Sequence, residues 1–173
     1  HGDGTNGSTT ITDSSPTPKT VTAAGNAQIS TAQSKFGGSS IAFDGSGDYL
    51  SIPSNIDFRL GTENFTIECW IRYNTVSGVQ ILFDTRPTAG TGLYPVIYSN
   101  GATLSYFTNA SDKITVLNAV AAGAWYHVAL VKNSGLTKLY LNGLQVGSAY
   151  TDSNDYLCGP LLFIGNDSYV PAL

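Results

Sequence analysis

Short apolar or alternating runs follow one another along most of the chain, and each run ends at a turn signal. The runs typical of strands are 40–43, 49–52, 64–73, 79–85, 93–99, 102–108, 113–118, 125–132, 137–141, 144–147 and 160–165. Regular short strands separated by Gly, Pro, Asn and Ser are typical of β-sandwiches and jelly rolls. Because no stretch of about ten residues keeps a helical period, the pattern predicts an all-β antiparallel sandwich with almost no helix.

The longest run, 64–73, divides its side chains between the two faces of a strand. The face expected to meet the core carries Phe65, Ile67, Cys69 and Ile71. The opposite face carries Thr66, Glu68, Trp70 and Arg72. We expect this strand to be central in its sheet. We also expect the large apolar areas of Trp70 and Trp125 to belong to the core.

Two hairpins are predicted near the end of the chain. Asn142-Gly143 separates two apolar runs, and this dipeptide strongly favours a two-residue turn in which both residues have positive φ. Residues 133–135, Asn-Ser-Gly, connect 125–132 to 137–141 in a similar way. These turns predict three consecutive antiparallel strands.

Residues 1–35 differ from the rest because they are rich in Gly, Ser, Thr and Pro and carry few large apolar side chains. Ser15 and Thr17 precede prolines, which favours extended conformations, and 20–22 could form an edge strand. We expect 1–35 to pack as an N-terminal segment on a sandwich formed by 36–173, the two making a single domain.

Composition excludes some functions. Charged residues make up 12% of the chain and the net charge is −4, whereas nucleic-acid binding needs clustered Lys and Arg. No apolar run is long enough to insert into a membrane. The two cysteines, Cys69 and Cys158, are too few for a disulfide framework, and we expect two buried free thiols, with a single bridge between them as the alternative.

Five blocks resemble a known family in their order and spacing. They are KFGGSSIAFDGSGDYLSIP (35–53), NFTIECWIRY (64–73), AWYHVALVK (124–132), LYLNGLQVG (139–147) and LFIG (162–165). Together they resemble the laminin G-like branch of the concanavalin A-like lectin/glucanase superfamily. The resemblance implies a concanavalin A-like jelly roll, an antiparallel β-sandwich that spans roughly residues 35–166.

Members of this family are commonly binding modules attached to extracellular enzymes, adhesins and phage structural proteins. The resemblance implies a non-catalytic module of an extracellular or virion protein, whose partner is a cell-surface glycan or a host-surface receptor. The Thr- and Gly-rich opening is similar to that of phage and marine bacterial members. The alternative is a structural or assembly module of a phage tail or capsid without a glycan ligand.

The acidic residues argue against glycoside hydrolysis, although the superfamily includes glucanases. Retaining enzymes need two carboxyl groups about 5–5.5 Å apart. The chain has two glutamates, Glu63 and Glu68, and Glu68 is flanked on its strand face by Thr66 and Trp70. His127 lies within an apolar run, where a structural role is expected, and no zinc or nucleophile motif occurs. We predict that the protein is not an enzyme.

Oxygen-rich turns could hold Ca²⁺, which takes carboxylate and carbonyl ligands. Asp3, Asp13 and Asp48 lie in Gly- and Ser-rich turns, and the resemblance implies that a structural calcium ion is common. The alternative for Asp44 and Asp48 is hydrogen bonding to nearby backbone amides within the turn.

Tyrosine-rich segments are the candidate ligand surface. Sugars pack their C–H faces on aromatic rings, while amide and hydroxyl groups bind their hydroxyls. The candidate residues from segments 84–112 and 149–157 are Arg86, Tyr94, Tyr98, Tyr106, Tyr150, Asn154 and Tyr156. The alternative is that these tyrosines cap the sheet edges.

Terminal strands that the family usually has are missing. Members usually begin with an apolar strand before the HGDG position and end with a strand that pairs near it. If 1–173 is the whole chain, unpaired edges near 1–6 and 167–173 are templates for a second chain. We then expect homo-oligomers through the sheet edges; if the chain is part of a longer protein, that protein supplies the strands.

Overall fold

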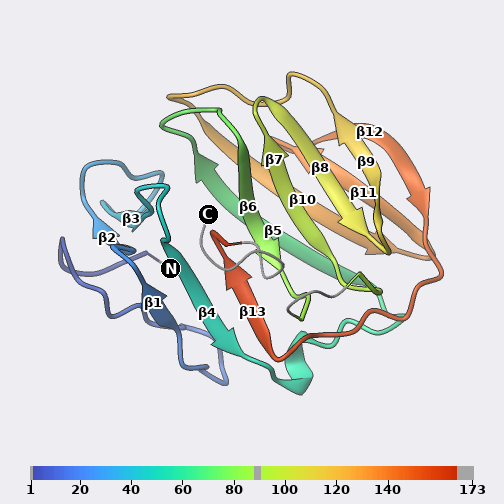
Figure 1. The fold of residues 1–173 in the computed structure, drawn as a ribbon, viewed down its shortest axis with the longest axis horizontal. Coiled ribbons are helices and arrows are strands. Elements are labelled where there is room, and N and C mark those ends of the chain that lie inside the picture. Colours follow the sequence, from blue (N-terminus) through green and yellow to red (C-terminus); the bar gives the residue numbers. More distant parts are fainter. Residues whose placement is uncertain (1, 88–90, 167–173) are drawn as a thin grey trace.

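The structure is a computed structural model that describes residues 2–87 and 91–166. Two sheets lie face to face, one in front of the other in Figure 1. Every pairing between the named strands of the structure is antiparallel. Within the described ranges, the helical structure is one short 3-10 segment, Ile56–Phe58 (η1). The predicted all-β sandwich is confirmed.

The larger sheet has seven strands in the order β1-β4-β13-β6-β7-β8-β9. They are β1 (Thr22–Ala24), β4 (Tyr49–Pro53), β13 (Leu161–Ile164), β6 (Val79–Asp84), β7 (Val96–Asn100), β8 (Thr103–Thr108) and β9 (Ser111–Val116). β13 pairs with both β4 and β6, so a late segment of the chain joins two early ones. The sheet therefore depends on contacts between residues far apart in the sequence.

The smaller sheet has four strands in the order β12-β11-β10-β5. They are β12 (Leu144–Thr151), β11 (Leu136–Leu141), β10 (Trp125–Asn133) and β5 (Phe65–Arg72). Both predicted hairpins are confirmed. Asn142 and Gly143 have φ values of 52° and 81°, as a two-residue turn with positive φ requires.

The prediction that 64–73 forms a central strand was wrong. Within the described part of the chain, β5 is the last strand of its sheet, and the nine-residue β10 takes the inner position. β5 pairs along its whole length with β10. The length of β5 therefore matches that of its one long partner strand and does not indicate a position between two strands.

The main core lies between the two sheets. Its buried members are Leu82, Ile97, Leu104, Tyr106, Ile114, Val128, Leu130, Leu139 and Tyr156. The inner face of β5 packs against them, as predicted, through Phe65, Ile67, Cys69 and Ile71. The expectation for the two tryptophans was wrong: Trp70 is 38% exposed and Trp125 is half-buried. Strand alternation turns Trp70 away from the core together with Glu68.

Residues 2–43 form an N-terminal lobe with a small core of its own. Ile11, Ala27 and Ile29 are buried there against Leu50 of β4. The lobe contains β1, which extends the larger sheet, and the two-stranded sheet of β2 (Gln28–Ser30) and β3 (Ser40–Ala42). In Figure 1 the lobe lies at one side of the sandwich. The β2–β3 pairing joins residues on both sides of the expected boundary at position 35.

Both cysteines are free thiols, as expected, but both are half-buried and not fully buried. Burial raises the pKa of the Cys69 thiol to about 11. No helical segment in 2–87 or 91–166 has the length and apolar character needed to cross a bilayer.

Candidate functional site

The outer face of the smaller sheet carries an aromatic cluster. The β5–β10 register places Trp125 opposite Arg72 and His127 opposite Trp70. Since the alternate residues of β5 pack into the core, these four side chains lie on the solvent side. The sheet thus presents two indole rings and an imidazole side by side.

Trp70 lies at the centre of this cluster. The His127 ring centre lies 5.2 Å from that of Trp70 at a tilt of 42°. Phe36, from the loop between β2 and β3, meets the indole edge-on at 5.6 Å. Lys35 Nζ, from the same loop, lies 4.4 Å from a Trp70 ring centre. The N-terminal lobe therefore supplies part of a site whose floor is the smaller sheet.

A shallow cleft of about 540 Å³ opens over these residues. Its lining residues are Lys35, Trp70, Trp125, His127 and Asn142. We call this region the outer-sheet cleft. Its lining combines flat apolar rings with cationic and amide groups, the combination expected of a site for a polar ligand that has an apolar face.

Hydrogen bonds and an ion pair position the polar groups in and beside the outer-sheet cleft. Asn142 Oδ1 accepts a hydrogen bond of 2.9 Å from the backbone N–H of His127. Glu68 Oε2 lies 3.5 Å from His127 Nε2. Arg72 donates from Nη1 to Asn74 Oδ1 at 2.9 Å. The amide, imidazole and guanidinium groups are thus positioned by neighbours on the same sheet or at its end.

Three of the predicted ligand residues lie on or next to strands β6 and β7 of the larger sheet. Tyr98 is half-buried on β7 and donates to Asp112 at 2.9 Å. Arg86 follows β6 and is 9% exposed, and its guanidinium donates to Asp84 Oδ1 at 3.1 Å and to Oδ2 at 2.8 Å. Tyr94 is half-buried just before β7. Of these, Arg86 is committed to a buried ion pair at 2.8 Å.

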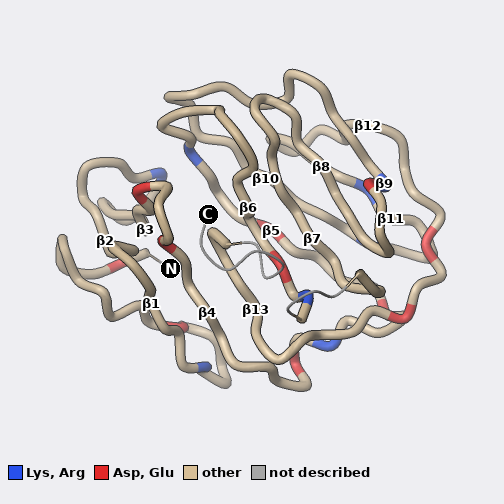
Figure 2. The backbone as a smooth tube through the Cα atoms, viewed as in Figure 1, with Lys and Arg blue, Asp and Glu red and all other residues tan. Residues whose placement is uncertain are grey.

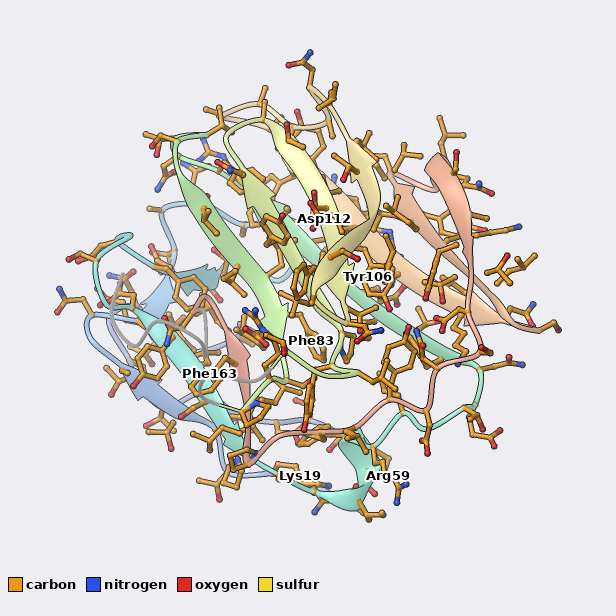
Figure 3. All side chains as sticks on the ribbon, turned by 45° about the vertical axis from the view of Figure 1, so that its right-hand side comes forward. Lys19, Arg59, Phe83, Tyr106, Asp112 and Phe163 are labelled. Atoms are coloured by element: carbon orange, nitrogen blue, oxygen red, sulfur yellow. The ribbon has the colours of Figure 1, made fainter. Side chains whose placement is uncertain are left out.

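The expectation that Tyr106 and Tyr156 form a ligand surface is corrected, because both are 0% exposed. Figure 3 shows Tyr106 between the sheets. Its hydroxyl lies 2.6 Å from that of Tyr156, which donates to Asp152 Oδ2 at 2.7 Å. Burial raises the pKa of both phenols. Strand alternation on β8 turns Tyr106 inward. The hydrogen bond between the two hydroxyls offsets the cost of burying these polar groups.

The remaining two candidates belong to the same interior network. Asn154 Nδ2 donates to the Tyr150 hydroxyl at 3.2 Å and to that of Tyr156 at 3.1 Å. Tyr150 packs partly buried against the main core. The structure therefore brings together four of the seven predicted residues, Tyr106, Tyr150, Asn154 and Tyr156, in one hydrogen-bonded group between the sheets.

The candidate calcium residues do not come together. Within the described ranges, no group of three His, Cys, Asp or Glu side chains could hold a metal ion. Asp48 accepts hydrogen bonds from the backbone amides of Asn26 and Asp44. Asp13 accepts from the backbone of Lys19, at 2.7 Å, and of Ser15, and these bonds lower its pKa.

Asp3 is exposed and lies close to Gly37, where an added Cβ would meet its carboxylate. The residues do not fit a shared ion site, and calcium binding stays a prediction from the resemblance.

The residues of the outer-sheet cleft were not among the predicted site residues. One signal was available for Trp70, since alternation places it with Thr66 and Glu68 on the polar face of its strand. Lys35 gave no signal, because its approach to Trp70 depends on how the N-terminal lobe folds back.

A laminin G family model, described as the concanavalin A-like lectin/glucanases superfamily, matches residues 44–172. The chain belongs to this family, as the five sequence blocks predicted. No curated protein sequence matches the chain.

Several solved structures share the fold. The binding domain of botulinum neurotoxin serotype D/C superposes with a TM-score of 0.69 at 16% identity, covering 96% of this chain and 43% of that one. The serotype D ligand binding domain, in complex with N-acetylneuraminic acid, has a TM-score of 0.67 at 16% identity, covering 92% and 40%. This chain thus spans about two fifths of those domains.

A carbohydrate-binding module is also similar. The CBM40 of the Ruminococcus gnavus IT-sialidase, bound to alpha2,3 sialyllactose, has a TM-score of 0.54 at 15% identity, covering 65% of this chain and 69% of that one. At these identities the likeness establishes a shared fold.

Proposed function

We propose that this chain is a non-catalytic carbohydrate-binding module and that the outer-sheet cleft holds the sugar. The observation that carries the proposal is the exposed indole of Trp70, framed by Trp125, His127, Asn142 and Lys35 over an open cleft. A pyranose ring presents C–H groups on its faces and hydroxyls at its rim. A flat aromatic floor with amide and cationic groups beside it matches both.

The glycans bound in two similar structures support the proposal. The serotype D neurotoxin domain is in complex with N-acetylneuraminic acid, and the CBM40 is bound to sialyllactose. Both are binding modules on the same kind of sandwich. The partner proposed for this chain is a glycan or host-surface receptor, and its setting is an extracellular or virion protein.

Binding without catalysis accords with the acidic groups around the outer-sheet cleft. Within the four strands of the smaller sheet, the one carboxylate is that of Glu68, which lies 3.5 Å from His127 Nε2 and pairs across the strands with neutral Ala129. Double displacement at a sugar carbon requires two carboxyl groups about 5–5.5 Å apart. One carboxylate beside an imidazole can position a hydroxyl group but does not make that pair.

A second cleft of about 380 Å³ lies beside η1 and is the less suitable candidate. Its lining residues are Ser54, Asn55, Ile56, Arg59, Leu157 and Cys158. None of these side chains is aromatic, so the second cleft has no ring on which a sugar face could stack.

A glycan array with paired variants tests the proposal. We expect selective binding by the unaltered chain and its loss in Trp70→Ala, because the stacking surface is removed. The matched control is Tyr98→Ala, which removes a half-buried aromatic residue from the outer face of the opposite sheet. Binding that survives Trp70→Ala but not Tyr98→Ala would assign the site to the larger sheet. An array with no bound glycan would contradict the function itself.

A further inference from the structure

The outer face of the smaller sheet, which forms the floor of the outer-sheet cleft, carries a charge opposite to that of the molecule as a whole. The chain has a net charge of −4, and its charged residues are few and spread over the fold (Figure 2). Yet the outer face of the smaller sheet carries Arg72 and Lys138, and Lys35 reaches it from the N-terminal lobe. The acidic residue on the same strands is Glu68. This face therefore has an excess of positive charge.

These basic groups are not neutralised by the protein. Among residues 2–87 and 91–166, no carboxylate forms an ion pair with Lys35, Arg72 or Lys138. The ammonium of Lys35 lies instead over aromatic rings, 4.4 Å from a Trp70 ring centre and 5.7 Å from that of Phe36. Cation–π contact holds a cation beside the stacking surface while leaving it able to meet an anion.

The order of the groups along β5 gives the cleft a direction. Glu68, Trp70 and Arg72 are alternate residues of one strand, so each lies roughly 7 Å from the next on the same face. The indole thus has a guanidinium on one side and a carboxylate on the other. Lys35 approaches the same indole. A ligand lying on Trp70 would have the Lys35 ammonium beside it, the Arg72 guanidinium in one direction along β5 and the Glu68 carboxylate in the other.

We infer that the outer-sheet cleft selects sugars that carry a carboxylate. The carboxylate would pair with Lys35 and Arg72, the ring would stack on Trp70, and hydroxyls would donate to Glu68. Charge-assisted bonds to Lys and Arg are roughly twice as strong as neutral ones, so they decide between an acidic sugar and its neutral counterpart. This inference rests on the proposed function and adds the chemical class of the ligand.

Two sources of this chemistry are tested against neutral counterparts by calorimetry. One arm uses 3′-sialyllactose and the other a tetrasaccharide that contains glucuronic acid. Each is paired with its carboxyl-reduced derivative, which differs only in the acid group. We expect at least one acidic sugar to bind about tenfold more tightly than its reduced form. The arm that shows this preference identifies the source.

Variants then assign the preference to residues. Lys35→Gln and Arg72→Gln are each expected to weaken binding of the acidic sugar about five- to tenfold, with little effect on the reduced sugar. Trp70→Ala should weaken both. The matched control is Lys113→Gln on β9, which removes a cation from the opposite sheet and should leave both affinities unchanged. Circular dichroism of each variant confirms that it is folded.

The outcomes separate the two proposals. Equal affinity for acidic and reduced sugars, with Lys35→Gln and Arg72→Gln silent and Trp70→Ala impaired, overturns the acidic selectivity and retains the carbohydrate-binding function. An equal loss in Lys113→Gln would show non-specific attraction and also overturns the selectivity. Failure to bind any sugar, acidic or neutral, overturns the function and the selectivity together.

Discussion

At the scale of single residues, the most demanding feature is an ion pair inside the sandwich. Lys132 is 2% exposed and Asp152 is 1% exposed, and Nζ lies 3.8 Å from Oδ1. Nζ also donates to the backbone carbonyl of Asn154 at 2.9 Å. Thr137 and Tyr156 donate to the other carboxylate oxygen. These hydrogen bonds offset part of the cost of removing both charges from water.

Removing one partner should therefore destabilise the fold strongly. Asp152→Ala leaves the Lys132 ammonium and two hydroxyl donors without their acceptor, and we expect a loss of about 3–5 kcal/mol in unfolding free energy. Urea denaturation measures it. The control is Asp155→Ala, three positions along on the exposed surface, which should change stability by less than about 0.5 kcal/mol. Similar losses in the two variants would contradict the role given to the buried pair.

A partly buried thiol and a buried phenol predict that the stability of the fold decreases at alkaline pH. Burial raises the pKa of Cys69 to about 11 and that of Tyr73 to about 12. Because the folded pKa values lie above the unfolded ones of 9.0 and 10.0, folding favours the protonated forms. Their contribution to stability is complete below pH 9 and is lost as the pH rises through about 11–12.

Thermal melts between about pH 8 and 11 test this, and the expected result is a falling melting temperature. In Cys69→Ala, which cannot ionise at that position, the decline should be shallower. A melting temperature that stays level to the top of the range would refute the linkage.

The aromatic residues show how far single positions can be predicted. Alternation along 64–73 already put Trp70 on the polar face, and the error came from giving its size more weight than its phase. Tyr106 and Tyr156 are different: their hydroxyls meet across a separation of 50 residues. No local pattern contains that distance, so a tyrosine-rich segment looks the same whether its hydroxyls face water or each other.

At the scale of elements, the tight turns set the strand order of the smaller sheet. Asn142 and Gly143 both have positive φ, and Asn142 also accepts the His127 backbone N–H. The turn therefore closes the β11–β12 hairpin and fixes a side chain of the outer-sheet cleft. The turn residues are adjacent in the sequence, and the Asn-Gly pair favours this turn by itself, which is why the hairpins were predicted. The edge position of β5 was not predicted, because it depends on pairing with a strand more than 50 residues later in the sequence.

Gly143→Ala should cost about 1–2 kcal/mol, since a side chain at a φ of 81° is strained although the space around the site is open. Gly143→Asn should cost less, because Asn tolerates positive φ. Chemical denaturation of both variants makes the comparison. An alanine variant as stable as the asparagine variant would show that the turn conformation is not the limiting factor.

At the scale of the whole molecule, two of the carboxylates named as calcium candidates join separate segments of the chain through hydrogen bonds. Asp48 accepts a hydrogen bond from the Asn26 backbone N–H, and this bond holds the β1–β2 turn against the start of β4. Gly25 is required at this corner, because an added Cβ would lie 2.8 Å from the Gly47 carbonyl oxygen. Calcium is therefore not needed to explain why this acidic turn is ordered.

A thermal melt with and without chelator tests the calcium hypothesis. Because the described carboxylates are scattered and bonded to amides, we expect an unchanged melting temperature. An ion that binds only the folded chain stabilises it by mass action, so a lowered melting temperature in chelator would support the calcium residues named from the resemblance. Strand addition between chains likewise stays a prediction, to be tested by light scattering.

The N-terminal lobe has a consequence for how ligand and fold are linked. Its core is small and separate from the main one, so the lobe is expected to open locally at a lower free energy than global unfolding. Opening would withdraw Lys35 and Phe36 from Trp70 while the sheet beneath stayed intact. A bound sugar that contacts both parts would stabilise the closed lobe. Hydrogen exchange at the amides of β2 should therefore be slower when the sugar is present.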